Sequence, residues 1–116
     1  MKTIEEMRQE TAVPVVISDH QGLITQVNQA FESVFGWRAS EIVGQPLTRL
    51  IPAKLRDAHR LGFSRFLTTG RPTMLGQPLK LRSVTKEGRE FDTEHTIIAE
   101  QCQGAWVFGA TIRPLG

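Results

Sequence analysis

Two histidines in this sequence occupy positions where an imidazole ring would face the inside of a domain, and the first is His59. It lies in the stretch 53–69, which follows Pro52 and ends at Gly70, the residue types expected at the start and end of a helix. The residues that recur at helical spacing on its face are apolar or small: Leu55, Gly62, Phe63 and Phe66. The glycine leaves room above the ring. The pattern therefore predicts an imidazole that faces a hydrophobic interior beside an open space.

The second inward-facing histidine is His95, in a predicted strand. Alternation along this strand places Phe91, Thr93, His95 and Ile97 on one face. Phe91 and Ile97 identify that face as the inward one, so Thr93 and His95 are predicted to line a cavity. Because buried polar groups need hydrogen-bond partners, we expect water or a polar ligand to face this pair.

The elements that must position these histidines follow the order strands, helices, strands. Asn28 is expected to cap the first central helix and Gly36 to end it, while His20 lies in an exposed turn. The order predicts an α+β domain with a five-stranded antiparallel sheet and helices packed on one face. The expected strands are residues 13–18, 23–27, 75–84, 90–101 and 105–113, and the later helical segments are 37–44 and 53–69.

Residues 1–11 are predicted to form a short amphipathic helix. Thr3 and Glu6 have the spacing of a capping box, and Ile4 and Met7 share a face. A helix this short is marginal without a surface to pack on. That surface is either the chain's own domain or a second copy, and both alternatives stay open.

Composition restricts the function further. The 116 residues suffice for one domain, with 40% hydrophobic and 22% charged residues and a net charge of +2. No basic run predicts nucleic-acid binding, and no apolar run has transmembrane length.

The single cysteine, Cys102, rules out an internal disulfide and fits a reducing, cytoplasmic compartment; we assign it no role. Catalysis is not expected, since no nucleophile–base pair, phosphate-binding loop or metal-ligand spacing appears.

Several short motifs in a fixed order resemble those of PAS domains. They are Val27-Asn28-Gln29-Ala30-Phe31, Phe35-Gly36-Trp37, Glu41-Ile42-Val43-Gly44-Gln45, Leu50-Ile51-Pro52 and Lys86-Glu87-Gly88-Arg89-Glu90-Phe91. The resemblance implies a sensory module with a small cavity between helix and sheet. It also implies a homodimer attached to an effector, such as a kinase or a DNA-binding region. We expect a cap helix at 1–11, the PAS domain at 12–113 and the start of a linker at 114–116.

The stretch 53–69 also resembles the corresponding helix of haem-PAS oxygen sensors. The matching residues are Arg56-Asp57-Ala58-His59, Ser64-Arg65-Phe66, Thr68-Thr69, Pro72 and Gly76. The resemblance implies that His59 would ligate the haem iron and that Arg65 would pair with a propionate. The sensor kinases carry an arginine where this chain has Leu79 and a histidine where it has Thr73. Trp106 resembles the tryptophan that steadies oxygen in a second group of haem-PAS sensors.

The sequence thus predicts a ligand-binding sensory PAS module of a signal-transduction or transcription-regulatory protein. The ligand is either haem bound through His59 and Arg65 or an unidentified small polar molecule. The alternative is a ligand-free module for protein interaction, which would dimerise through residues 1–11 and the outer face of the sheet. The candidate ligand-binding residues are His59, Gly62, Phe63, Phe66, Leu79, Thr93, His95 and Trp106.

Overall fold

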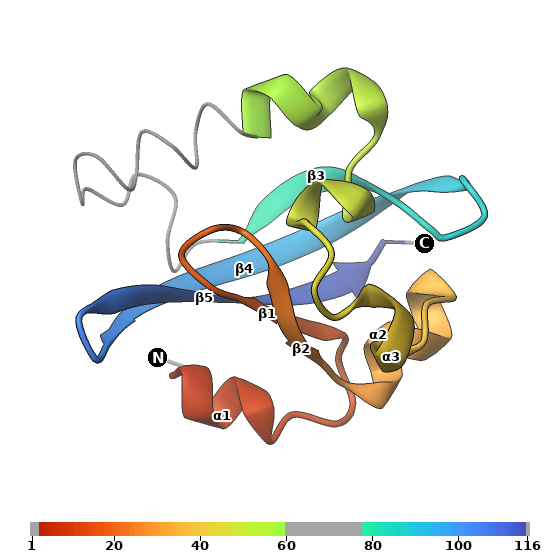
Figure 1. Cartoon of the computed structure of the whole chain (residues 1–116). Helices are drawn as coiled ribbons and strands as arrows, with labels where there is room; N and C mark the ends of the chain where they lie inside the picture. Colours follow the sequence, from red (N-terminus) through yellow and green to blue (C-terminus); the bar gives the residue numbers. More distant parts are fainter. Residues whose placement is uncertain (1–2, 60–77, 116) are drawn as a thin grey trace.

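The fold is an antiparallel sheet flanked by helices, as shown by a computed structural model that describes residues 3–59 and 78–115 (Figure 1). The sheet has five strands in the order β2-β1-β5-β4-β3, and neighbouring strands pair antiparallel. The strands are β1 Val15–Ser18, β2 Ile24–Val27, β3 Leu79–Val84, β4 Glu90–Cys102 and β5 Ala105–Pro114. The predicted α+β class and the five-stranded antiparallel sheet are therefore confirmed.

Short helices precede the sheet and fill the connection between β2 and β3. They are α1 Ile4–Arg8, α2 Gln29–Phe35, α3 Ala39–Ile42 and the 3-10 helices η1 Leu47–Leu50 and η2 Ala53–Leu55. Residues 56–59 continue helically after η2, while the predicted helical residues 60–69 lie outside the described part of the chain. One detail of the predicted apolar stripe is wrong, because the side chain of Leu55 is exposed.

The predicted caps are confirmed. The hydroxyl of Thr3 accepts from the backbone N–H of Glu6 at 3.1 Å, and the Glu6 carboxylate accepts from the Thr3 N–H at 3.1 Å. Asn28 Oδ1 accepts from the N–H groups of Phe31 and Val15, both at 3.0 Å, so one side chain starts α2 and fixes the beginning of β1. Gly36 ends α2 with φ of 78°, a left-handed conformation that favours glycine.

The helices from α2 onward pack on one face of the sheet. Their buried side chains form a continuous apolar cluster with strands β1, β2 and β5: Val16, Ile24, Phe31, Phe35, Ile42, Leu50 and Ile112. Phe91 of β4 packs against the same cluster, its ring centroid 5.4 Å from that of Phe35. We call this side of the sheet the inner face.

Helix α1 covers the opposite, outer face. Ile4 and Met7 are buried there with Val15, Ile17 and Ile98. Burial of each such side chain contributes about 1.5–3 kcal/mol, so α1 is held by its own domain. Of the two alternatives left open by the sequence, packing on the chain's own sheet is the one observed.

Candidate functional site

A cluster of three polar side chains lies on the inner face, where β3 pairs with β4. Ser83 is opposite Phe91, and Leu81 is opposite Thr93, so the side chains of all four residues lie on one side of the sheet. The Ser83 and Thr93 hydroxyl oxygens are 2.8 Å apart. His95 Nε2 lies 2.9 Å from the Thr93 oxygen and 3.3 Å from the Ser83 oxygen. Ser83 and Thr93 are fully buried, and His95 is half-buried.

The hydrogen bonds of Thr93 fix the tautomer of the histidine. Its hydroxyl donates to the carbonyl oxygen of Leu81 at 2.9 Å, and a hydroxyl has only one proton to donate. The Thr93 oxygen must therefore accept from both Ser83 and His95. Nε2 of His95 thus carries the proton, and a neutral ring then has a bare lone pair on Nδ1.

The environment keeps this imidazole uncharged. Burial, together with the smaller effect of the nearby charge of His59, lowers the pKa of His95 to about 4 from an ordinary value of 6.5. His59 is itself half-buried and ends the described helical segment 56–59. An imidazole from the helical side thus lies close enough to one from the sheet to influence its pKa, an interaction that the sequence analysis did not predict.

Beyond the polar cluster, the inner face of β4 and β5 becomes apolar. His95 is opposite Ile112, followed along the two strands by the pairs Ile97–Ala110 and Ala99–Phe108. No described residue of β3, β4 or β5 on this inner face carries a charge. The charged strand residues alternate onto the outer face, where Arg82 pairs with Asp92 and Arg113 with Glu94, both at 2.8 Å.

A further polar atom lies on the inner face of β1. Ser18 is opposite Phe108 of β5 and Ile24 of β2, and it is 1% exposed. Its hydroxyl is buried and has no hydrogen-bond partner among the residues that the structure describes. A buried hydroxyl of this kind costs stability, about 1–3 kcal/mol, unless something else satisfies it.

The predicted site residues divide into three groups. Thr93 and His95 are brought together, Leu79 is opposite His95, and His59 is close enough to change the pKa of His95. Trp106 shares the inner face but is six residues along β5 from Ile112, about 20 Å at strand spacing. A small ligand at His95 would not reach it. The other predicted residues, Gly62, Phe63, Arg65 and Phe66, lie outside the described residues.

One expectation needs correction. Thr93 and His95 were expected to need water or a ligand as hydrogen-bond partner, but the chain supplies Ser83 and the Leu81 carbonyl. Sequence reasoning missed Ser83. The signal was available, because the tight turn around Gly88 pairs Ser83 with Phe91 and so places it on the inward face.

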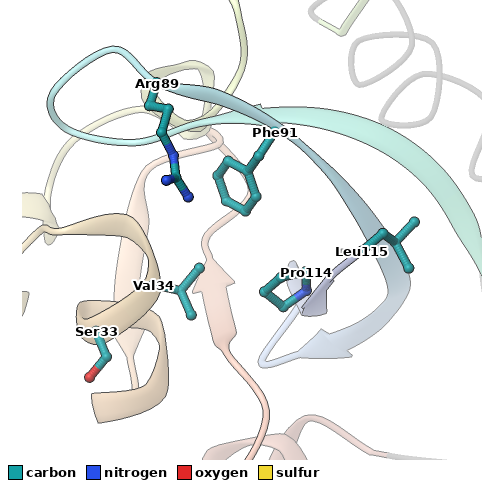
Figure 2. Close-up of a pocket in the computed structure, with 6 residues that line it drawn as sticks. All are labelled: Ser33, Val34, Arg89, Phe91, Pro114 and Leu115. Carbon is teal, nitrogen blue, oxygen red and sulfur yellow. The ribbon is translucent and has the colours of Figure 1, made fainter.

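A pocket of about 330 Å³ opens on the same side of the sheet, where β4 begins and β5 ends (Figure 2). Figure 2 shows the Arg89 guanidinium reaching over the space between α2 and Phe91; it lies 6.0 Å from the Phe91 ring centroid. The lining residues are Ser33, Val34, Arg89, Phe91, Pro114 and Leu115. Neither His59 nor His95 lines this pocket. The described residues contain no group of three or more potential metal-binding side chains.

Known proteins similar to this chain include sensors. It is 29% identical over 101 residues to the sensor protein FixL of Bradyrhizobium diazoefficiens, covering 87% of this chain. The PAS domain of an HTR-like protein from Haloarcula marismortui superposes with a TM-score of 0.74 at 18% identity, over 97% of this chain and 88% of that one. The RpfR quorum-sensing receptor PAS domain of Cronobacter turicensis, in complex with C12:0, superposes with a TM-score of 0.69 at 18% identity, over 92% and 97%.

The similarity to the curated relatives covers most of this chain but only a small part of each relative. This chain spans 14% and 20% of the length of the curated relatives it matches. None of the described helices is long and apolar enough to cross a membrane. Residues 3–112 match the PAS fold family. The chain therefore belongs to the PAS family.

Proposed function

We propose that this chain is a ligand-binding sensory module whose site lies on the inner face of the sheet, between His59 and His95. The observation that carries the proposal is the neutral polar cluster Ser83–Thr93–His95 beside an otherwise apolar face. A sheet that served only as packing surface would gain more stability from aliphatic side chains at these positions. The similarity to FixL and to a PAS domain in complex with C12:0 supports a sensory role.

Signal output would use the two elements that meet at the site. The helical segment and the sheet would have two arrangements relative to each other. A ligand that contacts both His59 and His95, and that binds one arrangement more tightly, shifts the population toward that arrangement. The sheet carries such a change to α1, because the residues that alternate with the inner-face positions of β4 and β5 contact α1 on the outer face. An effector outside this chain, such as a kinase or a DNA-binding region, would read that change.

Haem is the first candidate ligand. The donor set fits, because His59 offers an imidazole near the sheet and His95 offers an unprotonated Nδ1. Haem would supply gas binding or electron transfer when bound, while His59 would hold the iron and Arg65 a propionate. Leu79 provides no hydrogen-bond donor next to His95, so the chain itself would not steady bound oxygen from this position.

Titration with haem tests this candidate. We expect a Soret band that is lost in His59→Ala and kept in His20→Ala, because His20 is exposed in the β1–β2 turn. A titration without any spectral shift eliminates haem as the ligand.

A small polar molecule is the second candidate. It predicts thermal stabilisation of the chain by one or more members of a metabolite panel, weakened in His95→Leu and unchanged in His20→Leu. Should His95→Leu raise the melting temperature and leave every ligand response intact, the cluster is a packing feature. If haem also fails to bind, the sensory proposal is then wrong.

A ligand-free interaction module is the alternative, and the polar outer face beyond α1 favours it. Glu94, Thr96, Thr111 and Arg113 surround a hollow of about 170 Å³ there, next to Val13. A homodimer would use this face together with residues 1–11. Deleting residues 1–11 and measuring the mass in solution tests the role of the helix, and an unchanged oligomeric state removes it from the interface.

A further inference from the structure

The lone pair on His95 Nδ1 determines which chemical group a ligand must present to the cluster. Thr93 and Ser83 occupy Nε2, and Nδ1 makes no hydrogen bond to any residue that the structure describes. An unprotonated ring nitrogen only accepts hydrogen bonds. The complementary ligand group is therefore a donor, an O–H or an N–H.

A carboxylate is the wrong partner for this cluster. Its oxygens only accept, so it would face a lone pair unless His95 took up a proton. No charged side chain among the described strand residues shares the inner face, because Lys80, Arg82 and Arg113 alternate onto the outer face. A buried anion without a nearby cation loses its hydration and gains little in return.

The rest of the face favours an elongated apolar body. Ala99 lies four positions after His95 on β4, about 13 Å at strand spacing, and the inner-face side chains that follow His95 over this length are apolar. Phe108 and Ala110 form the neighbouring row on β5. At the far end of this strip, Ser18 holds a fully buried hydroxyl that has no partner among the described residues, so a polar group there also lacks a hydrogen bond.

We infer that the ligand of this site is an uncharged amphipathic molecule, with an O–H or N–H donor placed at His95 and an apolar chain lying toward Phe108 and Ser18. The inference rests on the proposed function and specifies the ligand class that the proposal leaves open. It therefore specifies the second candidate of the proposed function, the small molecule, and within that class it disfavours free fatty-acid anions.

Three probes that share a linear ten-carbon chain separate the possible chemistries. Decanol offers a donor, decyl methyl ether is uncharged but only accepts, and decanoate is an anionic acceptor. Titrations with the 116-residue chain at neutral pH, below the aggregation concentration of each probe, are followed by melting temperature and calorimetry. We expect decanol to bind about fivefold more tightly than the ether, as one neutral hydrogen bond allows, and decanoate to bind most weakly.

Three variants assign the preference to His95. In His95→Leu the advantage of decanol over the ether should disappear, because both probes then meet only apolar surface. In His20→Leu, the matched control at an exposed histidine, the fivefold preference should remain. His95→Asn, which keeps a side-chain acceptor, should restore part of the preference if His95→Leu proves poorly folded.

The outcomes are distinct from those that test the sensory role. Equal binding of decanol and its ether, stronger binding of decanoate, or no binding of any of the three probes overturns the inference. If one of these results is accompanied by a Soret band or by a metabolite that stabilises the chain through His95, the sensory proposal stands and only the ligand class is wrong.

Discussion

The Oγ1 atom of Thr93 lies 2.9 Å from Nε2 of His95, two residues further along β4. The same oxygen is 2.8 Å from that of Ser83, and its proton goes to the Leu81 carbonyl. One hydroxyl thus connects two neighbouring strands and sets the protonation of the imidazole. The chemistry of the site therefore depends on a residue that need not touch the ligand.

Thr93→Val should test this connecting role. The change keeps the shape of the side chain but removes the donor to the Leu81 carbonyl and the oxygen that accepts from Ser83 and His95. Ser83 and His95 then keep only their own longer contact of 3.3 Å. We expect a loss of about 1–3 kcal/mol in the free energy of unfolding, since buried polar groups lose their hydrogen bonds. Urea unfolding monitored by circular dichroism measures it.

Thr96→Val provides the matched control. Thr96 belongs to the same strand but lies on the outer face, half-buried beside the polar hollow. A cost below about 0.5 kcal/mol is expected there. Equal losses in both variants would mean that the Thr93 hydroxyl has no special structural role.

Stability should fall as the pH is lowered from neutrality. The pKa of His95 is about 4 in the fold, against an ordinary 6.5, because burial disfavours the charged ring. Between these values the unfolded chain holds a proton that the folded chain lacks, so the free energy of unfolding decreases from pH 6.5 toward pH 4. The full change would be about 3 kcal/mol for this group.

Thermal unfolding at several pH values checks this slope. His59 lies close enough to influence the pKa of His95, so the comparison should include variants at each histidine. In His95→Leu the part of the slope due to His95 should vanish, whereas His20→Leu should leave it unchanged. A profile for His95→Leu identical to that of the unaltered chain would show that His95 is protonated normally.

Features that depend on residues close together in the sequence could be predicted better than features that depend on how the strands pair. The capping box of Thr3 and Glu6 and the cap formed by Asn28 depend on residues close in the chain, and both were predicted correctly. Alternation also sufficed to place Thr93 and His95 on the inward face. These inferences succeeded because each depends on the period of a single element.

Features that depend on register between strands were missed. Ser83 joins the cluster only because β3 and β4 pair with Ser83 opposite Phe91. Trp106 was grouped with His95 because both lie on inward positions, yet the long β4–β5 hairpin separates them by about 20 Å. The buried hydroxyl of Ser18 had no signal at all, since serine at the end of a strand is usually a turn residue.

Ser18→Ala should not destabilise the chain in the absence of ligand. The Ser18 hydroxyl is buried without a partner, so its removal relieves a desolvation cost rather than breaking a bond. We expect the free energy of unfolding to rise by up to about 1 kcal/mol. A loss above about 1 kcal/mol in urea unfolding would show that this hydroxyl has a partner in the folded chain.

Gly109→Ala should loosen α1 from the outer face. A Cβ atom at this position would lie 2.8 Å from Ile4 Cδ1 and 2.8 Å from Met7 Sδ, both on α1. Relief requires the buried ends of the Ile4 and Met7 side chains, or α1 as a whole, to shift, at an expected cost of about 1–3 kcal/mol. The same substitution in a chain that lacks residues 1–11 should cost little, because the contact is already gone. The difference between the two costs is the coupling energy of this contact, and a coupling of zero would mean that α1 does not pack on its own sheet in solution.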